Sequence, residues 1–439
     1  MSEKTNIIKP RTLSGFVELL PADQILFNEM VDKIRASYEK FGFTPLDTPT
    51  LEYSEVLLAK AGGETEKQIY RFTKGDTDLS MRFDLTVPLA KYVAMHAGEL
   101  VFPFRRYQIG KVFRGERTQK GRFREFYQCD IDIIGDEALS ITTDAEVPAI
   151  IYETFTSLGF SDFTIRINNR KLLNGFFEQL GLIEKIADVL RIIDKIDKIG
   201  EENVKLELAK IEIDEKLVEQ IISFIQIKGN VDEMLEKLTS LSVENELFKQ
   251  GVQELTEVVS GIRGFGVPDN NFKIDLTIAR GLDYYTGTVY ETILNDYPSM
   301  GSVCSGGRYE NLAGFYTNKK LPGVGISIGL SRLFYQLREA EIITPSKLTT
   351  AKVMVMPLDT DMTYALNVAN VLRKNNINTE LNYTKKSVKA MMNYANRIKV
   401  PYVIVIGEDE TKTNTVTIKN MESGEQKNIS IEEAVTLLK

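Results

Sequence analysis

Apolar residues recur every three or four positions over residues 21–41, which predicts a helix with one buried face. Residues 43–49 contain two prolines and favour extended chain, because a residue before proline avoids helical angles. Residues 101–134 alternate between apolar and polar positions and predict two strands joined by a polar loop at 115–121. One face of the second strand carries Arg124, Phe126, Gln128, Asp130 and Asp132. Four polar groups on one strand face indicate a binding site, and a solvated sheet face is the alternative.

The composition and the spacing of apolar residues change several times in the second half of the chain. Residues 171–260 are rich in Ile, Leu, Lys and Glu at helical spacing and predict a helical insertion. Strands return at Phe272, and glycine-rich stretches at 301–307 and 323–329 precede a helix at 330–337. Beyond a linker at 336–350, a compact domain with a mixed sheet is expected. Its elements are strands at 352–357, 379–383, 402–407 and 415–419 and helices at 362–373 and 388–398.

Composition narrows the class of protein. The 439 residues suggest two or three domains, and no apolar run reaches the ~18 residues of a membrane helix. The first eleven residues lack the apolar core of a signal peptide, so we expect a cytoplasmic protein. Cys129 and Cys304 form no Cys-x-x-Cys pair and are expected to be free thiols. Residues 171–260 account for the whole net charge of −8, so the rest of the chain is neutral. The acidic total therefore does not exclude a nucleic-acid partner that binds outside this insertion.

Because His96 is the only histidine, several kinds of metal site and catalytic site are excluded. A histidine-rich metal site is impossible, and no Gly-x-Ser-x-Gly segment accompanies His96 to form a hydrolase triad. His96 ends a predicted helix just before Gly98, where a cation is favourable, so we interpret it as structural. A phosphate-binding P-loop is also absent. Residues 323–329 have Gly-x-Gly-x-x-x-Gly spacing rather than that of a dinucleotide loop.

Three stretches combine residues suited to an amino acid and a phosphate. Residues 81–88 contain Asp84 and Thr86, which on a strand would share a face and could hold an ammonium group. Residues 110–128 contain Arg114 and Glu116, again on one face of a strand. Residues 279–291 contain Arg280 and a Tyr-Tyr pair. Arginine presents a fork that suits phosphate and carboxylate groups.

These stretches resemble the histidyl-tRNA synthetase family of class II aminoacyl-tRNA synthetases. Arg114 in Val-Phe-Arg-Gly-Glu-Arg is similar to the second class motif, and Arg332 in Gly-Leu-Ser-Arg-Leu to the third. Residues 280–285 and 305–309 resemble two segments peculiar to the histidine enzymes, and residues 43–49 with the preceding helix resemble the first motif. The resemblance spans essentially the whole chain. Thr118 and Glu310-Asn311 depart from the family pattern, and Thr118 bears on the fit to the end of tRNA.

The resemblance implies an α+β catalytic core with an antiparallel sheet, a helical insertion and a C-terminal α/β anticodon-binding domain. The expected domains are core at 1–170, insertion at 171–260, core again at 261–338, linker at 339–350 and anticodon-binding domain at 351–439. It implies activation of L-histidine with ATP, expected with Mg²⁺, and transfer to tRNA(His) by a cytoplasmic homodimer. Dimerisation is expected through the N-terminal helix and residues 43–49.

The resemblance also assigns roles to residues of this chain. The expected catalytic residues are Arg280, Arg114 and Arg332. The expected histidine contacts are Asp84, Leu85, Thr86, Arg114, Gln128, Asp132, Arg280, Tyr284 and Tyr285. Arg114, Glu116 and Arg332 are expected to bind ATP, and Gln119 and Arg122 to contact the acceptor end of tRNA. No metal site built from side chains is expected.

One paralogue shares much of this pattern. The synthetase-like regulatory subunit of ATP phosphoribosyltransferase is a histidine-sensing protein with the same fold, and it can retain a Tyr-Tyr-Thr-Gly stretch. It generally lacks the C-terminal tRNA domain and loses the ATP-binding arginines. This chain keeps Arg114, Arg280, Arg332 and residues 351–439, so the enzyme is the favoured interpretation.

Overall fold

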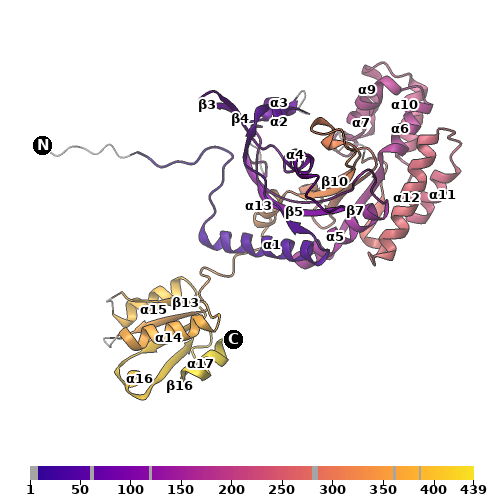
Figure 1. The fold of residues 1–439 in the computed structure, drawn as a ribbon. Coiled ribbons are helices and arrows are strands. Elements are labelled where there is room, and N and C mark those ends of the chain that lie inside the picture. The colour runs from indigo at the N-terminus through magenta and orange to yellow at the C-terminus, as the bar shows by residue number, and fades with distance from the viewer. Residues whose placement is uncertain (1–7, 60–63, 118–120, 279–284, 359–361, 385–386) are drawn as a thin grey trace. The chain divides into compact units, whose positions relative to one another are not determined.

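The computed structural model describes residues 8–59, 64–117, 121–278, 285–358, 362–384 and 387–439. Contacts between Cα atoms divide the chain into two compact units. The first comprises Met1–Val17 and Val31–Ala340, and the second comprises Glu18–Met30 and Glu341–Lys439. Many elements of each unit are labelled in Figure 1.

An eight-stranded sheet forms the centre of the first unit. Its order is β1-β5-β6-β11-β10-β9-β7-β8, and only the outer pairs β1–β5 and β7–β8 are parallel. The strands are β1 (Thr44–Pro45), β5 (Phe104–Phe113), β6 (Glu125–Ile134), β7 (Phe163–Asn169), β8 (Phe272–Ile274), β9 (Thr288–Leu294), β10 (Ser302–Tyr309) and β11 (Gly323–Ile328). The predicted antiparallel core is therefore confirmed, and both glycine-rich stretches belong to strands.

The two faces of the sheet differ in chemistry. On β6, Cys129, Ile131 and Ile133 are fully buried and form the apolar face. Helix α1 (Pro21–Lys40) reaches this face, since the Tyr38 hydroxyl donates to the Cys129 carbonyl at 3.0 Å. Helices α5 (Thr142–Leu158) and α13 (Leu330–Glu339) pack against β11 and β6. The opposite face carries the polar residues of the site.

A smaller sheet and four short helices also belong to the first unit. The sheet has the order β2-β4-β3. Its strands are β2 (Leu51–Tyr53), β3 (Arg71–Lys74) and β4 (Thr77–Met81), and the helices are α2 (Ser54–Leu58), α3 (Glu64–Gln68), α4 (Thr86–His96) and η4 (Leu312–Phe315). Helix α4 packs with η4 against Ile134 and Tyr309 and closes one end of the polar face of the large sheet. His96 lies in the last turn of α4, where its Nδ1 is 3.3 Å from Glu99 Oε1.

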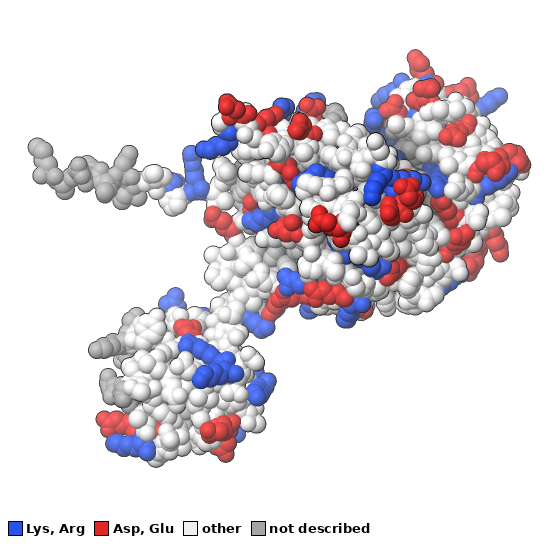
Figure 2. Space-filling model, viewed as in Figure 1, with Lys and Arg blue, Asp and Glu red and all other residues white. Residues whose placement is uncertain are grey.

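Helices alone form the segment between β7 and β8, apart from the short η2 turn (Asp269–Asn271). They are α6 (Arg170–Gln179), η1 (Ile183–Lys185), α7 (Ile186–Ile193), α8 (Ile196–Ile199), α9 (Glu201–Lys210), α10 (Glu215–Ile225), α11 (Val231–Ser240) and α12 (Glu246–Gly264). Every residue from 171 to 260 is described, so the predicted helical character of this segment is confirmed. Acidic side chains are frequent over these helices on the face shown in Figure 2.

The second unit contains a five-stranded mixed sheet of order β13-β12-β14-β15-β16. Its strands are β12 (Val353–Pro357), β13 (Thr379–Leu381), β14 (Tyr402–Ile406), β15 (Thr415–Asn420) and β16 (Gln426–Ser430). Its helices are α14 (Met362–Lys374), α15 (Val388–Arg397), α16 (Glu408–Thr413) and α17 (Ile431–Leu438). The mixed sheet was predicted, whereas β16, α16 and α17 were not.

No helix among the described residues is long and apolar enough to cross a membrane. Cys129 and Cys304 are both buried free thiols, as expected.

Candidate active site

Strand β6 supplies the centre of the polar face. Gln128, Asp130 and Asp132 alternate with the apolar residues and are 9%, 2% and 3% exposed. Such burial rules out a solvated sheet face. Arg124 was expected on the same strand, but it precedes Glu125, where β6 begins. Its Nε donates to the Glu116 carbonyl at 3.1 Å and braces the loop instead.

Asp132 is held by two neighbours that the sequence did not reveal. Arg106 on β5, its cross-strand partner, is fully buried and places Nη2 2.5 Å from Asp132 Oδ2. The Tyr309 hydroxyl donates to Asp132 Oδ1 at 2.9 Å. Burial raises the pKa of Asp132 to about 6, against the opposing effects of Arg106 and Tyr309. A carboxylate accepts about four hydrogen bonds, so Asp132 retains acceptor capacity for a ligand.

Gln128 and Asp130 meet at Ser327 on the neighbouring strand β11. Gln128 Nε2 donates to Ser327 Oγ at 2.6 Å, and Ser327 is the cross-strand partner of Asp130. Burial raises the pKa of Asp130 to about 7, although Arg106 and Ser327 act in the opposite direction. Neither Asp130 nor Ser327 was assigned a role from the sequence.

The stability of the protein should reflect the raised pKa of Asp130. The folded protein holds this proton up to pH of about 7, whereas a carboxyl with the ordinary pKa of 3.8 releases it earlier. The folded state therefore binds more protons within this window, and stability falls as pH rises through it. Asp130→Asn cannot ionise, so its stability relative to the parent should rise between pH of about 5 and about 8. Urea unfolding at several pH values measures this difference.

Asp78→Asn is the matched control. Asp78 is exposed, and its hydrogen bond with Arg71 lowers the pKa of the carboxyl below its ordinary value. Both folded and unfolded forms are therefore ionised above pH of about 5, and the difference from the parent should not change. If the stability difference between Asp130→Asn and the parent were equally independent of pH, Asp130 would not titrate in this range.

Asp84 and Thr86 are not on a strand, contrary to the expectation. Helix α4 begins at Thr86, and Asp84 Oδ1 accepts from the backbone N–H groups of Thr86 and Val87 at 3.2 and 2.9 Å. The carboxylate thus satisfies two otherwise unpaired donors of the first helical turn. Asp84 is 7% exposed, and burial raises the pKa of its carboxyl. Proximity of Asp84 and Thr86 follows from a helix start rather than from strand alternation.

Arg114 follows β5 directly and is oriented by aromatic rings. Its guanidinium carbon lies 4.4 Å from the centre of the Phe83 ring and 5.0 Å from that of Phe126. Its Nε donates to the Phe83 carbonyl at 3.2 Å. The expected common strand face of Arg114 and Glu116 is absent, because β5 ends at Phe113.

A second cationic group gathers around Arg332 at the start of α13. Arg332 Nη2 donates to the Met300 carbonyl at 2.8 Å. Burial and then nearby Arg122 lower the pKa of Arg332, while Glu116 raises it. Arg122 Nη1 lies 3.6 Å from Glu116 Oε2. Two cations beside one carboxylate leave net positive charge that suits a phosphate.

Glycines on β10 and β11 allow side chains of the site to lie close to the backbone of the sheet. A Cβ atom at Gly325 would lie 2.4 Å from Asp132 Oδ1, and one at Gly307 would lie 3.0 Å from the Tyr285 ring. Tyr285 is partly buried and packs against the cluster of α4 and η4. The structure thus brings Tyr285 to the same face as Asp132. Arg280, Tyr284 and Gln119 lie outside the described residues, as does Thr118.

An antiparallel sheet with an arginine after β5, a second on α13 and a buried polar face between them defines a class II aminoacyl-tRNA synthetase core. The model of a family described as "Histidyl-tRNA synthetase" matches residues 15–333, and one described as "Anticodon binding domain" matches 352–439. The chain belongs to the histidyl-tRNA synthetase family.

Relatives and solved structures agree with that assignment. A "Histidine--tRNA ligase" of Clostridium tetani is 62% identical, with 99% of each chain covered, and that of Finegoldia magna is 48% identical, with 99% of this chain and 100% of the relative covered. The crystal structure of histidyl-tRNA synthetase from Nostoc sp. PCC 7120 has a TM-score of 0.91 at 44% identity, covering 98% of this chain and 100% of that one.

The regulatory alternative shares the fold alone. A Bacillus halodurans structure titled as an ATP phosphoribosyltransferase regulatory subunit/histidyl-tRNA synthetase has a TM-score of 0.75 at 21% identity, with 91% of this chain and 99% of that chain covered. The relatives at 62% and 48% identity are ligases, so the regulatory interpretation is not favoured. The expected class of enzyme, an aminoacyl-tRNA synthetase, is confirmed.

Proposed function

We propose that this chain activates L-histidine with ATP to histidyl-adenylate and pyrophosphate, and transfers the histidyl group to the 3′ end of tRNA(His). The observation that carries the proposal is the buried polar face of β6 between Arg114 and Arg332. Arg114 contacts the Phe126 ring of β6, and α13, which carries Arg332, packs on β6, so both cations belong to elements that adjoin these carboxylate and amide acceptors. This combination suits an amino acid joined to a phosphate, and the 62% identical ligase supports histidine as that amino acid.

In this proposal the acceptors of the polar face hold histidine. Asp84, Leu85, Thr86 and Gln128 would lie around the α-amino group. Asp132 would accept from one imidazole nitrogen, while Tyr284 or Tyr285 would contact the other. Asp132 is suited to this task because Arg106 and Tyr309 fix its carboxylate. A pocket built on such hydrogen bonds rejects analogues that lack them by about 10⁴-fold or more.

The arginines would serve the phosphates. Attack of the histidine carboxylate on the α-phosphorus brings negative charge together, and fixed cations stabilise it. Arg114 would contact the carboxylate and α-phosphate, Arg280 the transition state, and Arg332 the γ-phosphate. Glu116 would help to hold ATP. Mg²⁺ would accompany ATP at its β- and γ-phosphates and help to neutralise their charge.

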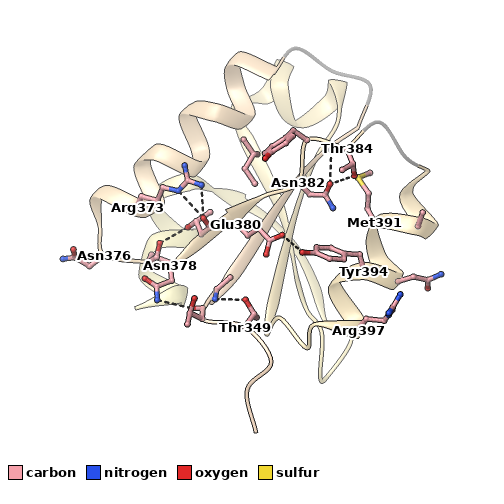
Figure 3. Close-up of a pocket in the computed structure, with 18 residues that line it drawn as sticks. Thr349, Arg373, Asn376, Asn378, Glu380, Asn382, Thr384, Met391, Tyr394 and Arg397 are labelled. Atoms are coloured by element: carbon pink, nitrogen blue, oxygen red, sulfur yellow. Dashed lines mark hydrogen bonds between the residues drawn. The ribbon is translucent and has the colours of Figure 1, made fainter. Parts of the chain in front are cut away.

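A groove in the second unit is our candidate for the anticodon (Figure 3). It has a volume of about 1350 Å³ and runs beside β13, the edge strand of the sheet. Tyr383 and Tyr394 line it and are 75% and 44% exposed. Arg373 and Arg397 add cations, and Asn376, Asn378, Asn382 and Asn393 add amides. Exposed aromatic rings beside cations and amides suit unpaired bases, which stack and form hydrogen bonds.

Tyr383→Ala should weaken the charging of tRNA. Loss of one stacking platform costs about 1–3 kcal/mol, so the KM for tRNA should rise roughly tenfold. Pyrophosphate exchange proceeds without tRNA and should keep its parent rate. Steady-state charging with a titration of tRNA measures the first effect, and exchange measures the second.

Arg397→Ala tests the same groove, and Lys427→Ala is its matched control outside the groove. Each removes one exposed cation of the second unit, but Lys427 lies on β16 at the opposite edge of the sheet. Of the two variants, only Arg397→Ala should change the salt dependence of tRNA binding. The slope of the logarithm of the binding constant against the logarithm of the salt concentration should become shallower by about 1. Equal effects of both substitutions would place the anticodon elsewhere.

The remaining parts of the proposal concern assembly and location. We propose a cytoplasmic homodimer formed through α1 and residues 43–49, with Arg122 and Gln119 near the acceptor end of tRNA. The proposed domains are 1–170 with 261–338 for catalysis, 171–260 for the insertion, 339–350 for the linker and 351–439 for the anticodon. The family models at 15–333 and 352–439 support the division between catalysis and anticodon binding.

Pyrophosphate exchange tests the activity directly. The purified full-length protein is incubated with ATP, labelled pyrophosphate and each of the twenty amino acids in turn. Label should enter ATP with histidine alone. Exchange supported by a different amino acid, with none for histidine, would disprove the proposed specificity.

A further inference from the structure

The polar face of the eight-stranded sheet extends beyond β6 as far as β7. Residues directly opposite each other in an antiparallel pair share one face of the sheet. One row of such partners contains, in order, Asp132, Gly325, Gly307, Val289 and Asn168. The adjacent row contains Asp130, Ser327, Ser305, Glu291 and Arg166. Asn168 and Arg166 therefore lie on the face that carries the candidate active site.

Asn168 is fully buried and holds the chain that follows β8. Its Nδ2 donates to the carbonyls of Leu276 and Ile278 at 3.3 and 3.1 Å. Its Oδ1 accepts from the backbone N–H of Asn169 at 2.8 Å, so hydrogen bonds fix both ends of the amide. A reversed amide would place its oxygen against two carbonyl oxygens, which cannot donate to it. The orientation of the Asn168 side chain is thus determined on both sides.

Arg166, two residues earlier on β7, is also buried and holds the same stretch of chain. Its Nε donates to Asp275 Oδ2 at 2.8 Å, and its Nη2 donates to Thr277 Oγ1 at 2.7 Å. Thr277 Oγ1 donates in turn to Asp275 Oδ1 at 2.6 Å, which closes a ring of three side chains. The remaining nitrogen, Nη1, donates to Glu291 on β9 at 3.0 Å and to Asp197 on α8 at 3.1 Å.

Each residue of the turn 275–278 is therefore hydrogen-bonded to a side chain of β7. Arg280 lies outside the described residues, but it is only two positions beyond Ile278 in the sequence. Two residues of chain span at most about 7 Å, so the position of Ile278 limits where Arg280 can lie. The chain is held again beyond this segment, since the Thr286 N–H donates to the Arg308 carbonyl at 2.8 Å.

We propose that Asn168 and Arg166 are positioning residues, which hold the turn 275–278 so that Arg280 meets the charge that develops in the transition state. This inference rests on the proposed function, which assigns that contact to Arg280. Misplacement of a catalytic group by about 1 Å can cost about 100-fold in rate. Two side chains outside the proposed substrate contacts thereby control the rate and leave the binding of both substrates unchanged.

Asn168→Ala tests this role, and Asn271→Ala is its matched control. Asn271 is also buried, and its Nδ2 donates to the carbonyls of Ser161 and Phe163 at 3.4 and 3.0 Å, at the opposite end of the β7–β8 pair. Each variant removes two such bonds, so both should lower the midpoint of urea unfolding by similar amounts. Only Asn168→Ala should lower the kcat of histidine-dependent pyrophosphate exchange, by about 10- to 100-fold. The KM values for ATP and histidine should change less than about twofold.

Thr277 offers a milder pair of variants, which carries the test if Asn168→Ala does not fold. Thr277→Val keeps the shape of the side chain and removes the hydroxyl that joins Arg166 to Asp275. Its kcat should fall about fivefold at unchanged KM values, the equivalent of one hydrogen bond. Thr277→Ser keeps the hydroxyl and should restore the parent kcat. A parent-like kcat in Thr277→Val and in Asn168→Ala would overturn the positioning role.

Arg280→Ala shows whether the turn acts through that arginine. If it does, Asn168→Ala combined with Arg280→Ala should be no more than about twofold slower than Arg280→Ala alone. Losses that multiply would mean that the two residues act independently, which would overturn the positioning role. Equal losses of kcat in Asn168→Ala and Asn271→Ala would also overturn it, because the effect would then be general damage to the sheet.

Other observations would contradict the proposed function itself. Parent protein without histidine-dependent exchange would disprove the activity, and this inference with it. Parent-like exchange by Arg280→Ala would remove Arg280 from the chemistry and overturn the inference as well. A large loss in Arg280→Ala together with a normal kcat in Asn168→Ala would overturn the positioning role alone and leave the proposed function standing.

Discussion

Arg106→Met should lower the free energy of unfolding by about 3–5 kcal/mol, the cost of leaving one charge of a buried pair without its partner. Arg106 is fully buried and the Asp132 side chain is 5% exposed, so water cannot replace the lost guanidinium. Methionine is long and apolar and fills most of the same space. Urea unfolding at neutral pH measures the loss.

Two further variants locate the cause of that loss. Arg106→Met combined with Asp132→Leu removes both charges and should recover most of the stability, since a buried pair is often replaceable by apolar residues. Arg105→Met is the matched control on the adjacent position. Its pair with Glu146 is more exposed, at 23% and 17%, and should cost about 1 kcal/mol. A loss in the double variant as large as in Arg106→Met would mean that packing, not charge, matters at Arg106.

Arg114→Ala should reduce the kcat/KM of histidine-dependent exchange about 100- to 1000-fold. Loss of one fixed donor to a developing charge costs about 3–4 kcal/mol. The rings of Phe83 and Phe126 hold the guanidinium before substrate arrives, so little reorganisation is needed during reaction. Exchange kinetics with separate titrations of ATP and histidine measure the effect.

Lysine at the same position separates charge from geometry. Arg114→Lys keeps one positive charge but loses the planar fork, and its rate should lie between the parent and Arg114→Ala. Arg71→Ala removes an exposed arginine on β3, outside the site, and should stay within about twofold of the parent. Parent-like exchange by Arg114→Ala would remove Arg114 from the proposed chemistry.

Local patterns predicted some elements and failed at others for identifiable reasons. Alternation on β6 is regular, so the polar face with Gln128 and Asp132 was visible. Strands β10 and β11 were not, because glycines such as Gly307 and Gly325 interrupt their apolar pattern. Those glycines are required by side chains above them, which only the folded sheet brings near. Strand β16 was missed because its residues are mostly exposed and polar.

The missed site residues have a different cause. Arg106 and Asp132 are opposite each other through the register of β5 and β6, and no local spacing links them. Asp84 and Thr86 are close together as expected, but they lie at a helix start and not on a strand. Pro88 in the first turn of α4 was the signal of that helix start, and the apparent strand alternation obscured it. Spacing within an element was informative, whereas pairing between elements required the structure.

The position of β11 has a consequence for synthesis on the ribosome. This strand lies between β6 and β10, yet it is the last strand of the sheet to be made. Synthesis adds about 5–20 residues per second, so roughly 10–40 seconds separate the completion of β6 from that of β11. Throughout that interval one hydrogen-bonding edge of β6 has no native partner. A nascent chain must protect that edge from pairing with other strands until β11 emerges.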